Sequence, residues 1–290
     1  MTAILIGLIP AMLWGILPLI LHYTKSNSWI QLKGTAQGNA LVAILVLLCL
    51  NPPTMSTPAL VLSFLSGFAW PIGMYGQFEC YKRLGVARTF PISAGLQIVG
   101  NALLGWLILG EWKSGRQIGL GMLGVLIILL GIVVSNVVFP LVKKEEEKTD
   151  KKAVLLLVLT TAGYWLYSLL PKLIVDGNPM SEFAPQALGI WFSVDLLVYV
   201  VGRQKRRDVM NRDGLVMTAV GTLYGFANIA FLYSISLNGM VKGFLLGQIN
   251  MIIATLLGIC ILKERPKVGL LKTCIGLVMI AVGCITIQMI

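Results

Sequence analysis

Long apolar runs, separated by short polar segments, dominate the chain. Ten of these runs have about 20 residues, which is enough for an α-helix to cross the roughly 30 Å of bilayer hydrocarbon. The predicted helices cover residues 2–22, 31–50, 58–79, 86–110, 117–139, 153–175, 183–201, 214–236, 240–262 and 267–289. Because the runs are continuous rather than alternating between polar and apolar positions, a transmembrane β-barrel is excluded. The pattern predicts an all-α integral membrane protein.

The sequence contains an internal repeat. The stretch Leu103–Trp112 returns as Leu256–Arg265 with six of ten positions identical, at an offset of 153. Other matches lie at nearly the same offset; they include Trp14 with Trp165, Gln31 with Gln186 and Gly67 with Gly221. We therefore interpret residues 1–140 and 153–290 as two copies of one five-helix unit, joined by a charged cytoplasmic linker at 141–152. An odd number of spans reverses the second copy, which predicts ten transmembrane helices as two inverted five-helix repeats.

The charges are sparse and unevenly placed. Charged residues make up 12% of the chain and the mean hydropathy is +0.86, whereas soluble domains have about 25% charged residues. Of the 23 Lys and Arg residues, 19 lie in or beside the loops after the odd-numbered helices. The exceptions are Lys113, Arg116, Lys172 and Lys242. This bias predicts that those loops, with the clusters Lys143–Lys152 and Arg203–Arg207, lie on the cytoplasmic side near anionic lipid, with both termini outside. The net charge of +11 therefore does not indicate a nucleic-acid partner.

The sequence shows no catalytic or metal-binding motif. It has one histidine, His22, and lacks G-x-S-x-G, H-E-x-x-H and a phosphate-binding glycine loop. Its five cysteines lie in or at the ends of apolar runs without a C-x-x-C pair, so we expect packing roles rather than disulfides or metal ligands. We expect neither an enzyme nor a cofactor.

Neutral polar and aromatic residues inside the predicted spans are candidates for a binding site. In the fourth span Ser93, Gln97 and Asn101 share one helical face, which must point into the bundle or toward water because lipid offers no hydrogen bonds. Trp14 and Trp165 lie mid-helix, away from the interfaces where Trp is usually found. The remaining candidates are Gln31, Gln77, Gln186, Asn228 and Gln248. Aromatic or amide neighbours of these positions are Trp70, Tyr75, Tyr224, Tyr233 and Asn250.

Amides and flat aromatic rings are the groups that bind a sugar well. Hydroxyl groups pair with amide donors and acceptors, and the C–H faces of a sugar ring stack on Trp or Tyr. For each candidate, the alternative is a structural role in helix packing or inter-helix hydrogen bonding. Glycines repeated through the fifth and tenth spans predict close helix packing, either between the two repeats or in a homodimer.

Asp195 lies well inside the seventh predicted span. Placing an ionised Asp at the centre of a span costs about 2.5–3.5 kcal/mol on insertion scales, so burial favours its neutral form. No Lys or Arg occurs in the same helix. We expect Asp195 to take up and release a proton during transport; the alternative is a neutral acid that only bonds its neighbours. For Glu79, beside Lys82 and Arg83, we expect an interfacial ion pair instead.

Several stretches resemble the glucose/ribose porter family of the drug/metabolite transporter superfamily. They are Pro10–Gly15, Gly85–Gly100 with its Pro-Ile-Ser-Ala-Gly-Leu-Gln-Ile-Val-Gly run, the Gly110-Glu-Trp112 turn and Gly163-Tyr-Trp165. The resemblance covers essentially the whole chain, and it implies a multi-pass protein of the bacterial plasma membrane that takes up a sugar together with protons. We therefore expect a secondary-active transporter that moves a neutral monosaccharide, glucose- or ribose-like, into the cell by alternating access.

Two other functions remain open. An exporter of drugs or amino-acid-like metabolites, as elsewhere in the same superfamily, would need a more apolar cavity or charged ligand partners. A membrane sensor or scaffold would need an output domain, for which the short loops leave no room. The amide-bearing face of the fourth span favours a sugar.

Overall fold

The computed structural model describes residues 2–24, 26–136, 150–175, 177–200, 211–263 and 269–290, and over these ranges the chain is all-helical. The helices are α1 (Thr2–Thr24), α2 (Ser28–Leu50), α3 (Thr57–Leu84), α4 (Val86–Leu107), α5 (Gly115–Asn136), α6 (Lys151–Leu169) with its 3₁₀ extension η1 (Leu170–Leu173), α7 (Pro179–Val200), α8 (Arg212–Asn238), α9 (Met240–Gly247), α10 (Asn250–Cys260) and α11 (Leu270–Gln288). Within the described ranges, ten helical segments are long and apolar enough to cross a membrane. The ten predicted spans are confirmed, with ends that differ by a few residues.

The ninth span is broken, which the apolar pattern did not predict. It consists of α9 and α10, with Gln248 and Ile249 between them. The Met251 amide bonds to the carbonyl of Gln248, three residues back, instead of four (3.0 Å). Gly247 directly precedes the break and faces Trp14; a Cβ there would lie 3.5 Å from the Trp14 ring. Glycine weakens a helix, which fits the end of α9 at this point.

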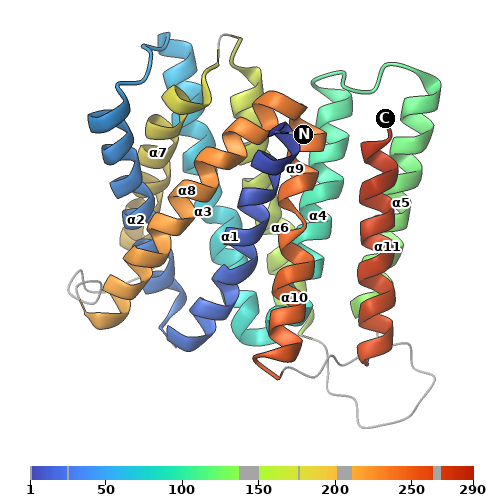
Figure 1. Cartoon of the computed structure of the whole chain (residues 1–290). Coiled ribbons are helices and arrows are strands. Elements are labelled where there is room, and N and C mark those ends of the chain that lie inside the picture. The colour runs from blue at the N-terminus through green and yellow to red at the C-terminus, as the bar shows by residue number, and fades with distance from the viewer. Residues whose placement is uncertain (1, 25, 137–149, 176, 201–210, 264–268) are drawn as a thin grey trace.

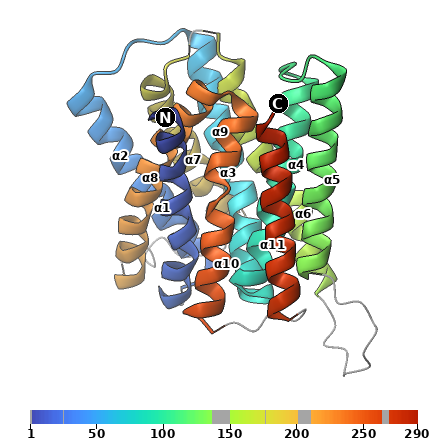
Figure 2. The same ribbon diagram turned by 45° about the vertical axis from the view of Figure 1, so that its right-hand side comes forward.

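The helices of the two halves interleave in the bundle. α2 packs against α8, α3 lies against both α6 and α7, and α1 contacts α8, α9 and α10. α5 and α11 form a pair at one edge of the molecule (Figures 1 and 2). A Cβ on Gly131 would lie 2.7 Å from the carbonyl oxygen of Gly276, so this pair depends on its glycines. Gly124, Gly131, Gly276 and Gly283 thus pack the first half of the chain against the second, whereas Gly115, Gly119 and Gly269 face open space.

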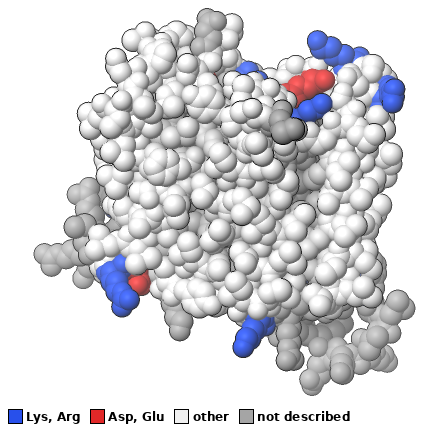
Figure 3. All heavy atoms as spheres, viewed as in Figure 1, with Lys and Arg blue, Asp and Glu red and all other residues white. Residues whose placement is uncertain are grey.

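The charged side chains of the face in Figure 3 lie toward the two ends of the helices, and the band between them is uncharged. Both chain ends lie at the same end of the bundle as the α4–α5 turn (Figure 1). The expected cytoplasmic cluster Arg203–Arg207 falls outside the described residues, as does most of the linker at 141–152. Asp150, at the end of that linker, caps α6 by accepting a bond from the Ala153 amide (3.0 Å).

We expect residues at opposite ends of the bundle to be labelled from opposite sides of the membrane. Ser114, in the α4–α5 turn, and Arg212, at the start of α8, are both exposed. In a variant without native cysteines, Ser114→Cys should react with a membrane-impermeant maleimide in intact cells, because the charge bias places that end outside. Arg212→Cys should react only after permeabilisation. Reaction of both from the same side would contradict the ten-span arrangement.

Candidate functional site

A narrow cavity with a volume of about 50 Å³ lies in the middle of the bundle. Its lining residues come from α1, α3, α4, α6, α8, α9 and α10. They are Trp14, Leu17, Met74, Gln77, Tyr81, Phe90, Gln97, Tyr164, Tyr167, Ser168, Tyr224, Phe231, Phe244, Gln248 and Asn250. None of them is Asp, Glu, Lys or Arg, so the polarity of this central cavity comes from amides and hydroxyls.

Gln77 of α3 organises one wall of the central cavity. Its Oε1 accepts hydrogen bonds from the Tyr164 hydroxyl (2.8 Å) and from Ser93 Oγ (3.1 Å), and its Nε2 donates to the Tyr81 hydroxyl. Gln97 Nε2 in turn donates to Ser93 Oγ (3.0 Å). A carboxamide offers two N–H donors and a carbonyl acceptor, so Gln97 keeps capacity for a ligand. The expected polar face of the fourth span is therefore coupled to Gln77, with Gln97 reaching the cavity.

Aromatic rings form the opposite wall. The Trp14 ring lies 5.7 Å from that of Tyr224 and 5.5 Å from that of Phe231, and Tyr167 stacks on Phe231 at 5.8 Å (centroid distances). The buried Trp14 Nε1 has no hydrogen-bond partner among the described residues. Because a buried donor without a partner costs free energy, this N–H is a ready donor for a bound polar solute. Trp14 therefore offers both a ring face and a donor.

Six of the ten expected binding residues do not line the central cavity; one of them, Ser93, bonds Gln77 directly behind it. Trp165 Nε1 donates to the carbonyl of Leu96 (3.1 Å), and the ring packs over Gly100. Gln186 Nε2 donates to Ser66 Oγ (2.8 Å) and Asn228 Nδ2 donates to Asn39 Oδ1 (3.1 Å), both on neighbouring helices. Gln31 Nε2 donates to the main-chain carbonyl of Leu21 (3.3 Å). Asn101 is 1% exposed and does not line the cavity. Trp165, Gln186, Asn228 and Gln31 thus bond neighbouring helices in this structure, and their role in substrate binding stays a prediction.

The sequence interpretation missed the residues of α6 that line the cavity. Tyr164, Tyr167 and Ser168 are spaced i, i+3, i+4 and share one helical face, whereas Trp165 is rotated by about 100° from Tyr164. The spacing was visible in the sequence. Trp165 was predicted as a binding residue instead because it matches Trp14 in the repeat. An i, i+3, i+4 search for polar aromatic residues would have found the correct face.

A second, wider cavity with a volume of about 370 Å³ opens at the end of the bundle opposite the chain termini. It lies between the ends of α1 and α3 and the starts of α2 and α4. It is lined by Pro18, Leu21, His22, Ser26, Asn27, Gln31, Phe78, Tyr81, Lys82 and Val86. Tyr81 lines both cavities, and its ring stacks on Phe90 at 6.1 Å. Tyr81 is therefore the side chain that stands between the two spaces.

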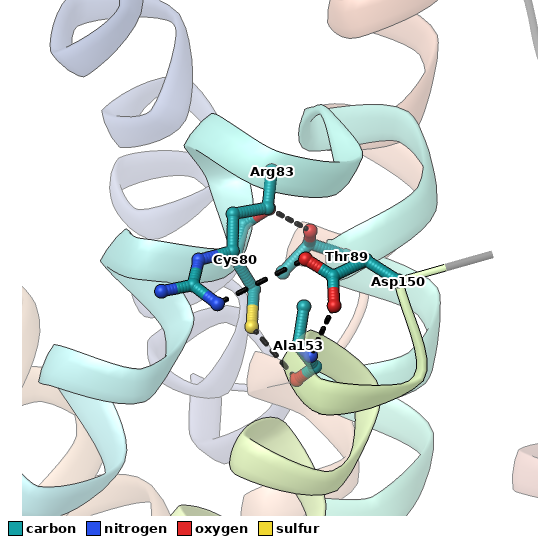
Figure 4. A network of polar contacts seen from close by, with 5 residues as sticks. All are labelled: Cys80, Arg83, Thr89, Asp150 and Ala153. Atoms are coloured by element: carbon teal, nitrogen blue, oxygen red, sulfur yellow. Dashed lines mark hydrogen bonds and ion pairs between the residues drawn. The ribbon is translucent and has the colours of Figure 1, made fainter. Parts of the chain in front are cut away.

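A polar network at this same end holds α3, α4 and α6 together (Figure 4). Cys80 Sγ donates to the carbonyl of Ala153 (3.2 Å), and the Cys80 carbonyl accepts from Thr89 Oγ1 (2.9 Å). Asp150 Oδ2 lies 3.8 Å from Arg83 Nη1. Arg83 thus pairs with Asp150 of the linker. The network gives Cys80 a structural role as a free thiol.

Asp195 has a positively charged partner on a neighbouring helix, which the search within its own helix could not reveal. Lys33 of α2 places Nζ 3.1 Å from Asp195 Oδ1, and the Asp195 side chain is 41% exposed. This pair lies near the start of α2 and the end of α7, outside both cavities. A second acid in the same helix, Glu182, is only 6% exposed, and Lys172 acts on it electrostatically. The predicted span began at residue 183, so Glu182 was missed.

The comparisons with known proteins agree over nearly the full length of the chain. A family model described as "Sugar transport protein" matches residues 5–290. A Lactiplantibacillus plantarum protein named "Putative sugar uptake protein" is 36% identical over 290 residues, 99% of each chain. A Latilactobacillus sakei protein named "Putative ribose uptake protein RbsU" is 30% identical over 284 residues, 97% of this chain and 96% of that one. One crystal structure, 17% identical, shares the fold with a TM-score of 0.70 and covers 98% of this chain and 97% of its own.

We expect Gln97 and Asn101, one turn apart on α4, to differ in access to water. Gln97 lines the central cavity, whereas Asn101 is buried away from it. In a background without native cysteines, Gln97→Cys should react with a small water-soluble thiol reagent applied on the side of the second cavity. Asn101→Cys should react far more slowly. Equal reaction rates would contradict the assigned position of the cavity.

Proposed function

Because the chain belongs to the sugar transport protein family, we propose that it moves a neutral monosaccharide, glucose- or ribose-like, into the bacterial cell by alternating access. The chain is a multi-pass membrane transporter and not an enzyme. The proposal concerns the substrate, the direction and the mechanism. The single observation that carries it is the uncharged, amide- and aromatic-lined central cavity.

The chemistry of the central cavity matches that of a sugar. Gln97 and Gln248 provide carboxamides, and Tyr164 and Ser168 provide hydroxyls that can exchange hydrogen bonds with sugar hydroxyl groups. The Trp14 ring provides a face for stacking. An amino-acid-like or ionic substrate would leave its charge without a partner, because the lining residues carry no charge. This favours a sugar over the exporter alternative.

The packing of the helices supports two inverted repeats. We match the five spans of the first half, α1 to α5, in order with the five of the second, which are α6, α7, α8, α9–α10 and α11. Under this match, the contact of α2 with α8 corresponds to that of α7 with α3. The contact of α1 with α8 corresponds to that of α6 with α3. The α5–α11 and α2–α7 contacts correspond to themselves. A molecule built in this way can exchange the conformations of its halves and open alternately to either side. The second cavity at one end suits a state that opens toward the cytoplasm.

We assign proton coupling to the Lys33–Asp195 ion pair. It joins α2 of the first half to α7 of the second at the end where the second cavity opens. Protonation of Asp195 would remove the charge that attracts Lys33, and would weaken this contact between the halves. Proton binding and the relative position of the halves are then linked, which is what coupled transport requires.

The central cavity can be tested with matched alanine variants. Gln97→Ala should weaken uptake of labelled D-glucose or D-ribose into proteoliposomes, raising the half-saturating concentration by about 5- to 150-fold. A buried sugar hydroxyl then loses its partner. Gln37→Ala is the matched control, because Gln37 is also half-buried and bonds Thr218 Oγ1 outside both cavities. An unchanged half-saturating concentration in Gln97→Ala would reject this wall as the binding site.

The coupling acid can be tested with Asp195→Asn, which keeps the size of the side chain but cannot titrate. We expect this variant to lose accumulation driven by a proton gradient while sugar still equilibrates downhill. Glu182→Gln is the control, since Glu182 is a buried acid of the same helix that takes no part in the Lys33 pair. Full gradient-driven accumulation of sugar by Asp195→Asn would contradict the assignment of proton coupling to the Lys33–Asp195 pair.

A further inference from the structure

The Glu111 carboxylate binds the beginning of α9. Its Oε1 accepts a hydrogen bond from the Met240 amide (2.8 Å), and its Oε2 accepts one from the Val241 amide (3.1 Å). Glu111 follows α4 in the first half of the chain, and Met240 begins α9 in the second. The first amides of a helix have no partners within it, and the helix dipole favours a negative charge there. One carboxylate therefore caps a helix of the other half.

The local structure holds Glu111 in place. Gly110 has a left-handed backbone (φ 62°), and the Glu111 amide bonds the carbonyl of Gly105 (3.0 Å). Trp112 is buried, stacks on Trp106 at 5.9 Å and packs against Gly121. This turn closes the repeated stretch Leu103–Trp112. The anchored backbone on both sides of Glu111 directs its side chain at α9.

Glycines leave room for this contact. A Cβ on Gly105 would lie 3.2 Å from Glu111 Oε2 and 2.5 Å from a Val241 methyl, so a larger residue there would push the two halves apart. Gly239, which directly precedes α9, has φ 82°, a conformation that favours glycine. The cap therefore needs the glycines of both halves as well as the carboxylate.

The contact lies at the opposite end of the bundle from the second cavity. The second cavity includes Val86 at the start of α4, whereas Glu111 comes after the end of α4, roughly 33 Å further along the helix axis. Another bond between the halves lies at the Glu111 end, where Asn238 Nδ2 donates to the carbonyl of Ala3 (3.2 Å). In this structure the two halves are therefore bonded to each other at the Glu111 end, and the second cavity opens at the other end.

The cap also controls the position of a cavity residue. α9 has only eight residues, about 12 Å of helix, and Gln248 follows directly at its far end. Gln248 lines the central cavity. Because α9 is separated from α10 by the break, its position depends on what holds its first turn. Glu111 binds the first two amides of this turn through two charge-assisted bonds, whereas Gln288 Nε2 and Ser234 Oγ reach only the carbonyls of Lys242 and Gly243.

From this geometry we propose that Glu111 is a positioning residue for transport. It clamps α9 while the protein is open at the second cavity, keeps the opposite end closed and holds Gln248 in the central cavity. Opening of the opposite end then requires the carboxylate to release the Met240 and Val241 amides. The inference rests on the proposed alternating access.

The test measures access to the central cavity from each side and needs no sugar. The reporter is Gln97→Cys in a background without native cysteines, with a membrane-impermeant thiol reagent applied to right-side-out or inside-out vesicles. Glu111→Gln can no longer accept both bonds as a carboxylate does. We expect it to raise the labelling rate from the side opposite the second cavity by about fivefold or more.

Matched variants keep the result interpretable. Gln117→Ala is the control, because Gln117 bonds the Lys113 and Ser114 amides of the same turn without contacting α9, and we expect it to leave both rates unchanged. If Glu111→Gln does not fold, Glu111→Asp serves instead, because it keeps the charge but is shorter. It should raise the labelling rate from the same side by a smaller factor.

Unchanged labelling from both sides in the folded Glu111 variant would overturn the clamp. So would an equal shift in Gln117→Ala, since the effect would then belong to the turn and not to the carboxylate. A protein that transports no monosaccharide, yet shows the Glu111-dependent shift, would contradict the proposed substrate and leave the clamp standing. The two proposals therefore fail in distinguishable ways.

Discussion

Polar groups inside a membrane protein must find hydrogen-bond partners within the protein, and this requirement organises the whole bundle. Gln186 meets Ser66, Asn228 meets Asn39 and Gln77 meets Tyr164, and each pair joins a helix of the first half to one of the second. These bonds fix how the two halves face each other. Some buried groups keep unused bonding capacity among the described residues. Trp14 Nε1, the Tyr167 hydroxyl and Asn250 Oδ1 belong to residues that line the central cavity, whereas others, such as Ser63 Oγ and Thr255 Oγ1, lie elsewhere in the bundle.

The contacts between halves differ at the two ends of the bundle. At the end with the second cavity, the Lys33–Asp195 ion pair joins the two halves, and Arg83 pairs with Asp150 of the linker; in these pairs only Lys33 is largely buried. At the other end a carboxylate caps a helix through main-chain amides. Ion pairs respond to protonation and to salt, whereas a cap on main-chain amides depends chiefly on the position of the helix. The central cavity lies between these two kinds of contact, with Tyr81 on the side of the second cavity.

The sequence predicted the ten spans because length and apolarity alone determine whether a helix can cross a bilayer. It did not predict the break before α10, because Gly247, Gln248 and Asn250 interrupt the apolar run only briefly and the whole stretch still has the length of one span. The candidate site was predicted in part. Gln77, Gln97 and Gln248 line the cavity, but Trp165 does not, since the match with Trp14 ignored which face of α6 points inward. The partner of Asp195 was invisible because Lys33 is far away in the sequence.

The central claim is that a sugar occupies the cavity between Gln97 and the Trp14 wall. Ser168 lines this cavity, and Ser168→Cys changes only one atom of its side chain. The most direct measurement is the rate at which this cysteine reacts with a small thiol reagent as D-glucose or D-ribose is added. The account predicts that the transported sugar slows the reaction. The sugar concentration that gives half of the maximal slowing should be close to the concentration that half-saturates uptake. A rate that no transported sugar changes would contradict it.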